Sequence, residues 1–389
     1  MRCEQNEVFL RQEERPKAWR GRSTRAKLAM LTAELLALLA LACTGGGGIS
    51  IGPPPPQPAG EFLYVANLSQ FVSGFRVQSG HLAVIPGSGT MLPFPPINFA
   101  ADPKGQFLGV VEFQNTNTPA VQLLAIQPGG TLAAGAQVPI TGAFALAFSG
   151  NNLLAVIDQN DEQVEVFAIQ NGTLTLVSSA PTGPLPADAL FSADDRTLYV
   201  ANSFGDSISV YSVSASGTMQ SLQMLSLPFA AGQIIAPAER LRLNPAGDKL
   251  AAVTAIGQLY VSQVSAIDGT LSATTETIVS DGANLQEVIF DPSGRNIYTG
   301  DTDNGGLFGF AIAADGSATP LPGSPVPTGM LLNGMAINSA GDRLYAVNGI
   351  NSEIATFLRN TTTGMLTPTT EVVSTGGFLP GRMVRVPAH

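Results

Sequence analysis

One short strand pattern occurs seven times in the chain, and no other feature limits its fold as strongly. Each copy has six mostly apolar residues and ends in a polar residue. The closing residues lie 44 to 52 positions apart, so one unit of regular length is used repeatedly. The copies are Phe62–Asn67, Phe107–Glu112, Leu153–Asp158, Thr197–Asn202, Lys249–Thr254, Asn296–Asp301 and Arg343–Asn348.

The neighbours of each copy define a unit of four strands. A turn rich in Asp, Asn, Pro and Gly precedes the copy, as in Asp291–Arg295, and an alternating strand follows it, as in Ser207–Val213. A glycine turn such as Asp268–Thr270 then leads to a weaker outer strand. Alternation between tight turns is typical of antiparallel hairpins. With strands named A to D from the axis outward, the sequence predicts an all-β, seven-bladed β-propeller over residues 61–389.

The two ends of this region indicate how the ring closes. The first copy, a strand B, has no strand A before it, whereas an unassigned strand, Arg382–Pro387, follows the last unit. We therefore expect the C-terminal strand to pair with the N-terminal strands in one blade. This 1+3 closure removes the open sheet edge that would invite aggregation.

Residues 1–42 differ in composition from the rest of the chain and are typical of an export signal. Eight Lys and Arg residues precede an apolar run, Leu28–Ala42, and Cys43 follows it directly. This order resembles a bacterial lipoprotein leader, in which the cysteine is acylated. An uncleaved anchor or a plain signal is the alternative. Residues 43–60, with Gly45–Gly48 and Pro53–Pro56, predict a linker, so we expect an exported, membrane-anchored protein at the periplasm or cell surface.

Composition excludes several classes of site. Cys3 and Cys43 are the only cysteines, so residues 61–389 contain no disulfide and no thiol nucleophile. Residues 43–389 carry a net charge of −13, which disfavours a nucleic-acid partner and suits cations or basic ligands. No motif predicts a cofactor or a transition-metal site. Ca²⁺ could bind several channel oxygens, but no ligand pattern supports it.

Propeller topology sorts the polar residues onto two rims. The B–C loops and the D–A connections share the rim around one mouth of the central channel, where groups from all blades converge. Asn and Asp at strand ends also cap turns through their side chains, which is the structural alternative. The B–C positions are Asn67, Glu112, Asp158, Asn202, Thr254, Asp301 and Asn348, and the D–A positions include Asn98, Asp188, Glu239, Arg240, Gln286, Glu287, Asn333 and Arg382. The long D–A connection of residues 226–241 is apolar and could cover the channel mouth.

Three kinds of segment carry a resemblance to a known family. These are the cores Tyr64–Asn67 and Tyr199–Asn202, the turn Asp291–Arg295, and third strands such as Val210–Val213. Together they resemble the YVTN-repeat and lactonase family of seven-bladed propellers, which includes propeller 6-phosphogluconolactonases. The resemblance covers residues 61–389 and implies the fold; lactone hydrolysis is the activity that it implies.

The family resemblance leads one to look for His and Arg at the start of strand A, and the matching segment here is Pro186–Phe191, which has neither. His81 is expected in a C–D turn on the opposite rim, and His389 ends the chain. Catalysis would therefore use Asp188 or Glu287 as base and Arg382 or Arg240 as electrophile, with a carboxylate in place of the family His.

Two further functions compete with lactone hydrolysis. The first hypothesis is a binding or scaffolding module in the bacterial envelope that takes a small molecule or a protein at the channel rim. Its candidate binding residues are Asn67, Glu112, Asp158, Asn202, Asp301, Asn333 and Asn348. The other is a surface-layer repeat protein whose ligand is another protein.

Overall fold

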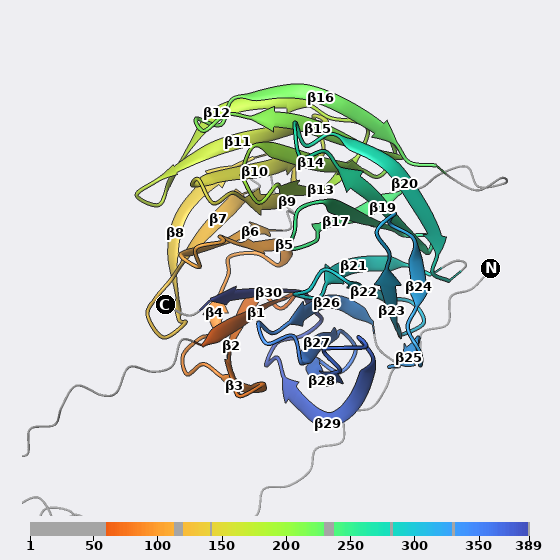
Figure 1. The fold of residues 1–389 in the computed structure, drawn as a ribbon. Helices are drawn as coiled ribbons and strands as arrows, with labels where there is room; N and C mark the ends of the chain where they lie inside the picture. The colour runs from red at the N-terminus through yellow and green to blue at the C-terminus, as the bar shows by residue number, and fades with distance from the viewer. Residues whose placement is uncertain are drawn as a thin grey trace, which may run out of the picture. The chain divides into compact units, whose positions relative to one another are not determined.

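The computed structural model describes residues 60–112, 120–140, 142–228, 237–280, 283–328 and 331–387. The predicted leader, Cys43 and the linker up to residue 59 therefore lie outside the described residues, as do His389 and residues 229–236, half of the connection of residues 226–241. The described residues form seven antiparallel sheets arranged as blades around one centre, as Figure 1 shows. The predicted all-β, seven-bladed propeller is confirmed.

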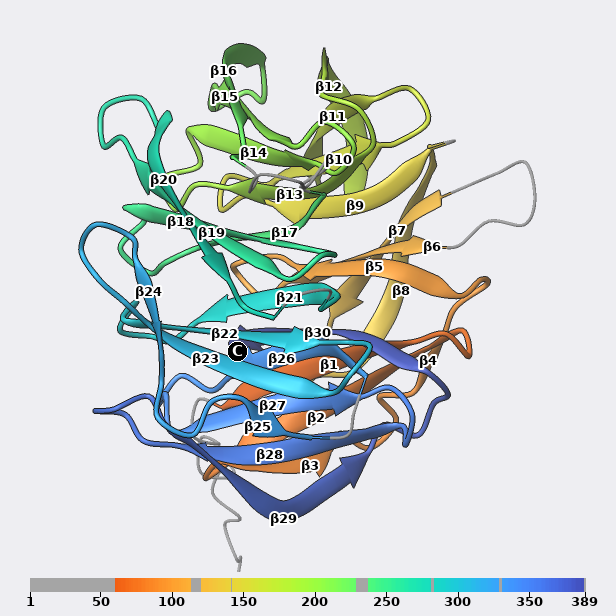
Figure 2. The same ribbon diagram turned by 90° about the vertical axis from the view of Figure 1, so that its right-hand side faces the viewer.

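Each blade contributes one inner strand to the wall of the channel, and the next strand outward is the repeated sequence pattern. Figure 2 shows the blades stacked beside one another around the ring. The inner strands are β5 (Pro96–Ala101), β9 (Ala143–Phe148), β13 (Pro186–Phe191), β17 (Ala238–Leu243), β21 (Leu285–Phe290), β26 (Leu332–Ile337) and β30 (Pro380–Pro387). The second strands are β1 (Glu61–Asn67), β6 (Phe107–Glu112), β10 (Leu153–Asp158), β14 (Thr197–Asn202), β18 (Lys249–Thr254), β22 (Asn296–Asp301) and β27 (Arg343–Asn348).

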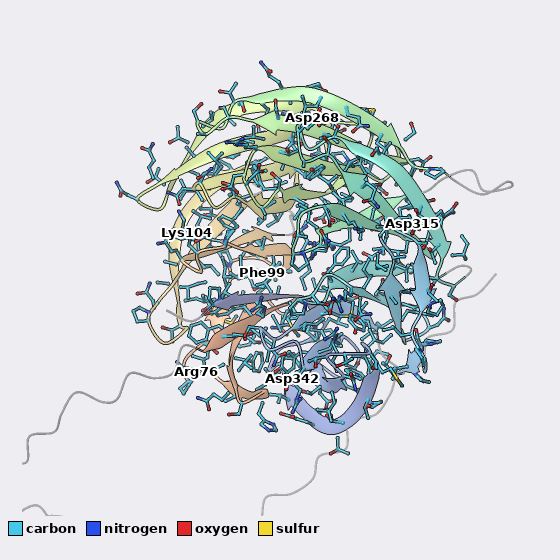
Figure 3. The ribbon with its side chains drawn as sticks, viewed as in Figure 1. Arg76, Phe99, Lys104, Asp268, Asp315 and Asp342 are labelled. Carbon is cyan, nitrogen blue, oxygen red and sulfur yellow. The ribbon has the colours of Figure 1, made fainter. Side chains whose placement is uncertain are left out.

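The third and fourth strands form the outer part of each blade. The third strands are β2 (Phe71–Gln78), β7 (Ala120–Ile126), β11 (Gln163–Gln170), β15 (Ser207–Val213), β19 (Gln258–Val264), β23 (Gly306–Ile312) and β28 (Glu353–Arg359). The outermost are β3 (His81–Val84) with β4 (Thr90–Met91), β8 (Leu132–Pro139), β12 (Thr173–Pro181), β16 (Met219–Ser226), β20 (Leu271–Ile278), β24 (Ala318–Pro320) with β25 (Val326–Pro327), and β29 (Leu366–Ser374). Figure 3 shows charged side chains such as Lys104, Asp268 and Asp315 on the outside, with Phe99 near the centre.

Seven apolar clusters form the core, and each lies between two neighbouring blades. The cluster between the third and fourth blades, for example, joins Ile157 and Val166 to Leu198 and Val200. Strand B is buried on both faces, which explains why its pattern is almost continuously apolar. Each fully buried Leu or Val side chain contributes about 1.5–3 kcal/mol, so the blade-to-blade contacts hold the ring together.

Tyrosine hydroxyl groups add a hydrogen bond between some blades. The Tyr64 hydroxyl donates to the carbonyl of Gly130 in the next blade, at 2.8 Å, and Tyr345 donates to Gly80 at 2.8 Å. Tyr199 and Tyr298 make the same contact with Gly269 and Gly364. The tyrosine of the repeated pattern is thus a structural residue.

The ring closes as the sequence predicts, because β30 pairs antiparallel with β1. Val384 lies opposite Tyr64, and Val386 opposite Phe62, so the C-terminal strand is the inner strand of the N-terminal blade. Where β1 begins and β30 ends, Arg385 lies 3.4 Å from Glu61. No helix in the described part of the chain is long and apolar enough to span a bilayer.

A buried arginine links the sixth and seventh blades. Arg359 on β28 is 4% exposed and pairs with the carboxylate of Asp291. It also donates to the Tyr298 hydroxyl at 2.8 Å, to the Gly341 carbonyl at 2.8 Å and to Asn296 at 2.9 Å. One guanidinium group faces one carboxylate here, and we call this set the interblade cluster.

Candidate functional site

Every inner strand is irregular near its start, where it enters the channel. The pairing register with strand B shifts there in all seven blades, for example between Pro186 and Asp188 on β13 and between Ala238 and Arg240 on β17. Such a β-bulge bends the strand and re-aims the side chains beside it. The bulges therefore place one ring of side chains at a common depth in the channel.

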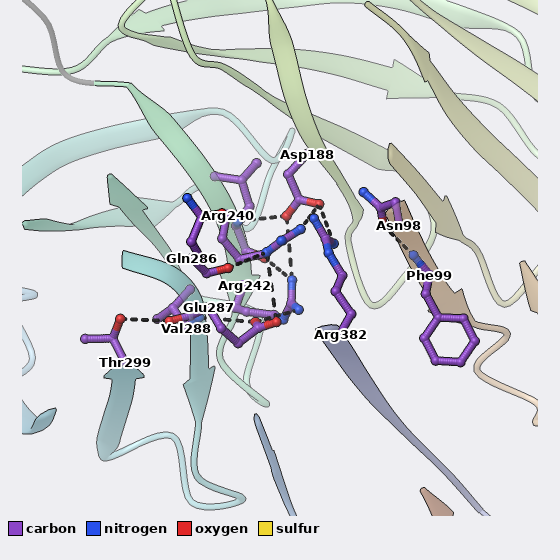
Figure 4. Close-up of polar contacts among 11 residues, drawn as sticks. Asn98, Phe99, Asp188, Arg240, Arg242, Gln286, Glu287, Val288, Thr299 and Arg382 are labelled. Carbon is purple, nitrogen blue, oxygen red and sulfur yellow. Dashed lines mark hydrogen bonds and ion pairs between the residues drawn. The ribbon is translucent and has the colours of Figure 1, made fainter. Parts of the chain in front are cut away.

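Four of the predicted residues meet at this ring (Figure 4). They are Asp188 on β13, Arg240 on β17, Glu287 on β21 and Arg382 on β30, and they come from the fourth, fifth, sixth and first blades. We call them, with Arg242, the channel cluster. The prediction that these four side chains share one site follows from their equivalent places in the repeat.

The ion pairs of the cluster are short and mostly buried. Arg240 lies 3.0 Å from Asp188 and 4.0 Å from Glu287, and all three side chains are at most 3% exposed. The backbone amide of Leu241 also donates to Asp188, at 2.9 Å. Asp188, Arg240 and Glu287 therefore join three successive blades across their inner edges.

Arg242 completes the cluster, although the sequence analysis did not name it. Its guanidinium lies 2.8 Å from Glu287 and 3.6 Å from Asp188, and its side chain is 32% exposed. Residues two apart on a strand share a face, so the alternation of β17 was the signal that placed Arg242 beside Arg240.

Arg382 reaches the cluster from the opposite side of the channel. Its strand belongs to the first blade, yet its guanidinium lies 3.8 Å from Asp188 of the fourth blade. A Cβ atom on Gly334 would lie 2.6 Å from the Met383 amide and 2.7 Å from the Gly381 carbonyl, so the glycine lets β26 approach β30 closely. Three guanidinium groups thus face two carboxylates, and Arg242 and Arg382 are the partly exposed members.

The pKa values of two acidic side chains at the site, Asp188 and Glu239, are shifted in opposite directions. Burial opposes ionisation of Asp188, but Arg240, Arg382, Arg242 and the Leu241 amide outweigh it and lower the pKa of this carboxyl. Burial raises the pKa of nearby Glu239, which accepts a hydrogen bond from the Ser203 hydroxyl at 3.0 Å. Glu239 is therefore a better proton acceptor than Asp188.

Burial and the positive charge of Arg240 both disfavour the charged form of Arg382. They lower the pKa of Arg382 to about 9. The guanidinium stays protonated at neutral pH, so the cluster keeps its three positive groups.

A cavity of about 890 Å³ lies beside the cluster, on the side of the A–B turns. Its inner end is formed by Asp188, Arg242 and Arg382. Its other end reaches the A–B turns at Pro103, Gly150, Pro245, Pro292 and Ser339. The described part of the channel thus opens at one rim and meets the charged cluster at the other end.

Most of the B–C residues make the contacts of turn-capping side chains. Asp158 accepts from the amides of Asn160 and Asp161, and Asn348 from those of Ile350 and Asn351. Two others do so, namely Thr254, bonded to Ile256 and Gln258, and Asp301, bonded to Asn284, Asp303 and Asn304. Asn202 instead accepts from the Gly183 amide and donates to the hydroxyls of Ser207 and Ser209. The structural alternative thus accounts for these groups.

Two buried B–C residues keep polar atoms without a regular hydrogen bond among the described residues. Asn67 donates to Ser73 at 2.9 Å, but its carbonyl oxygen has no donor. Neither carboxylate oxygen of Glu112 has a hydrogen bond of regular geometry, and burial raises its pKa to about 7 against the smaller, lowering effect of the Phe94 backbone. Glu112 is therefore a buried acid with only a weak backbone contact at the end of β6.

The remaining candidates lie apart from the channel cluster. Asn333 is partly buried at the start of β26, and within the described chain it makes no polar contact with the channel cluster. His81 is exposed on β3 and lies 3.0 Å from Glu371 of the seventh blade. The described residues contain no group of three or more His, Cys, Asp or Glu side chains that could hold a metal ion.

Comparison with known proteins places the fold among lactonase-like propellers. No protein-family model and no curated protein matches the sequence. Solved structures do match. A *Bacteroides uniformis* protein assigned as a 6-phosphogluconolactonase shares 21% identity at a TM-score of 0.74, over 85% of this chain and all of that one.

Two more structures agree. A *Bacteroides fragilis* protein with the same assignment gives a TM-score of 0.73 at 17% identity, over 86% of this chain and all of that one. A periplasmic gluconolactonase of *Pseudomonas aeruginosa* gives 0.73 at 16% identity, over 85% of this chain and all of that one. At these identities the likeness shows the seven-bladed fold alone.

Proposed function

We propose that this lactonase-like propeller is an exported, lipid-anchored binding module that takes a small anion in its central channel. The observation that supports it is the charge of the channel cluster, where three guanidinium groups face two carboxylates. The net charge of the chain is negative, so a group of three arginines, with Glu239 as a third acid nearby, is not a general property of the surface. Anions that reach the cavity meet Arg242 and Arg382 first.

Arginine is suited to this task. Its planar guanidinium donates parallel hydrogen bonds to a carboxylate or phosphate. Arg240 makes a short ion pair with Asp188 and a longer one with Glu287, whereas among the described residues Arg382 has only Asp188, at 3.8 Å. Arg382 therefore has donors to offer an incoming anion without breaking a short ion pair.

Calorimetric titration of the purified chain with gluconate, 6-phosphogluconate and inorganic phosphate tests the proposal. We expect saturable binding that weakens at least about tenfold in Arg382→Met, because a charge-assisted hydrogen bond contributes about 1.5–3 kcal/mol. Arg295→Met removes the same charge from an exposed turn and should bind as the unmodified chain does. An equal loss in both variants would show a general charge effect, and no binding of any anion would refute the proposal.

Lactone hydrolysis is the second candidate, and the raised pKa of Glu239 favours it. In this reaction the Glu239 carboxylate takes a proton from water. The hydroxide attacks the lactone carbonyl carbon, and the guanidinium of Arg382 or Arg240 stabilises the oxyanion. The ring C–O bond then breaks, and the proton returns to the leaving oxygen. The ion pairs of Asp188 and Glu287 leave these two acids weaker candidates for the base.

A panel of sugar and aliphatic lactones distinguishes the two candidates. Hydrolysis should rise with pH as Glu239 ionises, and Glu239→Gln should abolish it while Asp188→Asn and Glu287→Gln retain measurable turnover. Binding of gluconate without turnover of any lactone would exclude the enzyme and leave the binding module.

The export part of the proposal has its own experiment. Radiolabelled palmitate should enter the protein in cells and disappear in Cys43→Ser, because only a cysteine at this position can be acylated. Labelling that survives Cys43→Ser would contradict the lipid anchor, and recovery in the soluble fraction would contradict membrane attachment.

A further inference from the structure

The wall of the cavity differs in chemistry from its inner end. Partly exposed apolar side chains from four different strands line it, namely Leu190 on β13, Leu243 on β17, Ile289 and Phe290 on β21, and Val384 on β30. The charged groups at the inner end are Asp188, Arg242 and Arg382. The charged groups on the wall nearer the A–B turns are already engaged, since Asp195 accepts from the Gly150 amide, Asp291 pairs with Arg359 and Arg385 lies 3.4 Å from Glu61.

The cavity is also long in one direction. The inner strands run along it, and the three residue steps from Asp188 to Phe191 span about 10 Å, at about 3.3 Å per step. A volume of about 890 Å³ is within the range of small-molecule sites, which are mostly apolar with a few polar groups that fix orientation. A sugar acid would satisfy the guanidinium groups and leave this apolar wall in contact with water.

We propose that the anion bound in the channel is amphipathic, a carboxylate with an unbranched acyl chain of medium length. The carboxylate lies at Arg242 and Arg382, and the chain extends along Leu243, Ile289 and Val384 toward the A–B turns. This inference rests on the proposed anion site and names the class of ligand. It also assigns the direction of access, through the rim that carries Pro103, Pro245 and Pro292.

Titration of the purified chain with butanoate, hexanoate, octanoate and decanoate tests the chain-length dependence. Burial of each methylene group strengthens binding about two- to fourfold, so decanoate should bind at least about a hundredfold more tightly than butanoate. Decyltrimethylammonium, which has the same chain and the opposite charge, should not bind. Equal affinity along the carboxylate series would overturn the inference, and so would binding of the cation as tight as that of decanoate.

Matched variants locate the acyl chain of the ligand within the cavity. Ile289→Ser and Val384→Ser should each weaken decanoate at least about threefold and leave butanoate unchanged. Ile267→Ser makes the same change at a residue that is 96% exposed and should have no effect. Circular dichroism of each variant confirms folding, and the second wall variant keeps the test decisive if the first does not fold. If neither folded wall variant weakens the binding of decanoate, its acyl chain does not lie in this cavity and the inference fails.

The series separates this inference from the proposal that it extends. Gluconate or butanoate binding that depends on Arg382, without any gain from a longer chain, would overturn the acyl ligand and retain the anion site. If no carboxylate binds, both fail.

Discussion

The channel cluster and the interblade cluster are both built from arginines and buried carboxylates, but the exposure of their arginines differs. Arg359 is buried and faces one carboxylate, and three further acceptors share its remaining N–H groups. In the channel three arginines lie within 4.0 Å of two carboxylates, and two of the three are partly exposed to a cavity. A buried and fully bonded set stabilises the fold, whereas a set with partly exposed arginines beside a cavity has bonding capacity for a ligand.

The largest expected effect is on the interblade cluster. Arg359→Met leaves the carboxylate of Asp291 buried without its cation, and breaking a buried pair in this way costs about 3–5 kcal/mol. Urea unfolding followed by circular dichroism should show this loss.

The double variant Arg359→Met with Asp291→Asn is the control for that experiment. It removes both charges, so it should regain part of the lost stability. A loss below about 1 kcal/mol in the single variant would contradict a structural role for the interblade cluster.

Glu112 extends the comparison to a buried acid with no arginine. Its pKa is about 7 in the folded chain against 4.5 ordinarily, so folding favours the protonated form. The contribution of Glu112 to stability should be greatest below pH 4.5 and fall as the pH rises through 7, by about 1–3 kcal/mol. Glu112→Gln should flatten the dependence between pH 4.5 and 7, measured by urea unfolding at each pH. Exposed Glu162→Gln is the control, and an unchanged slope in Glu112→Gln would contradict the assignment.

Comparing two tyrosine variants shows how much the hydrogen bond from Arg359 contributes to stability. Tyr298→Phe loses the bond to Gly364 and the bond from Arg359, whereas Tyr345→Phe loses only the bond to Gly80. We expect destabilisation of about 2 kcal/mol and about 1 kcal/mol, respectively, in thermal unfolding. Equal losses would mean that the Arg359 bond contributes nothing measurable.

The smallest stability change is expected in the channel. Burial and Arg240 already disfavour the charge of Arg382, and Asp188 keeps Arg240 and the Leu241 amide when Arg382 is removed. Arg382→Met should therefore change the free energy of unfolding by less than about 1 kcal/mol, while anion binding falls. A loss above about 2 kcal/mol would show that Arg382 is structural.

The fold could be predicted because its determinants are local and repeated. Six of the seven strand B segments have the predicted bounds, and β1 begins one residue earlier, at Glu61. The meeting of Asp188, Arg240, Glu287 and Arg382 follows from equivalent repeat positions on a closed ring. A repeat cannot show pairing across the channel, however, so the contact of Arg382 with Asp188 and the role of Gly334 required the structure.

Other features depend on side-chain contacts that a single sequence does not show. Asn or Asp at a strand end can cap a turn or bind a ligand, and only the bonds of Asp158 and Asn348 assign them to capping. Net charge is uninformative about the channel for the same reason. It averages over the whole surface, whereas the channel cluster brings together arginines from two strands.

The closure of the ring by β30 also sets the order in which the site is made. The strand that carries Arg382 follows every other strand in the sequence, although it belongs to the first blade. A nascent chain emerges from the ribosome in sequence order. The first blade therefore lacks its inner strand until the other six blades have been synthesised. A product that ends before β30 lacks both the β1–β30 pairing and the guanidinium of Arg382. A ligand that binds at Arg382 would therefore select full-length molecules and slow the release of the strand that completes them.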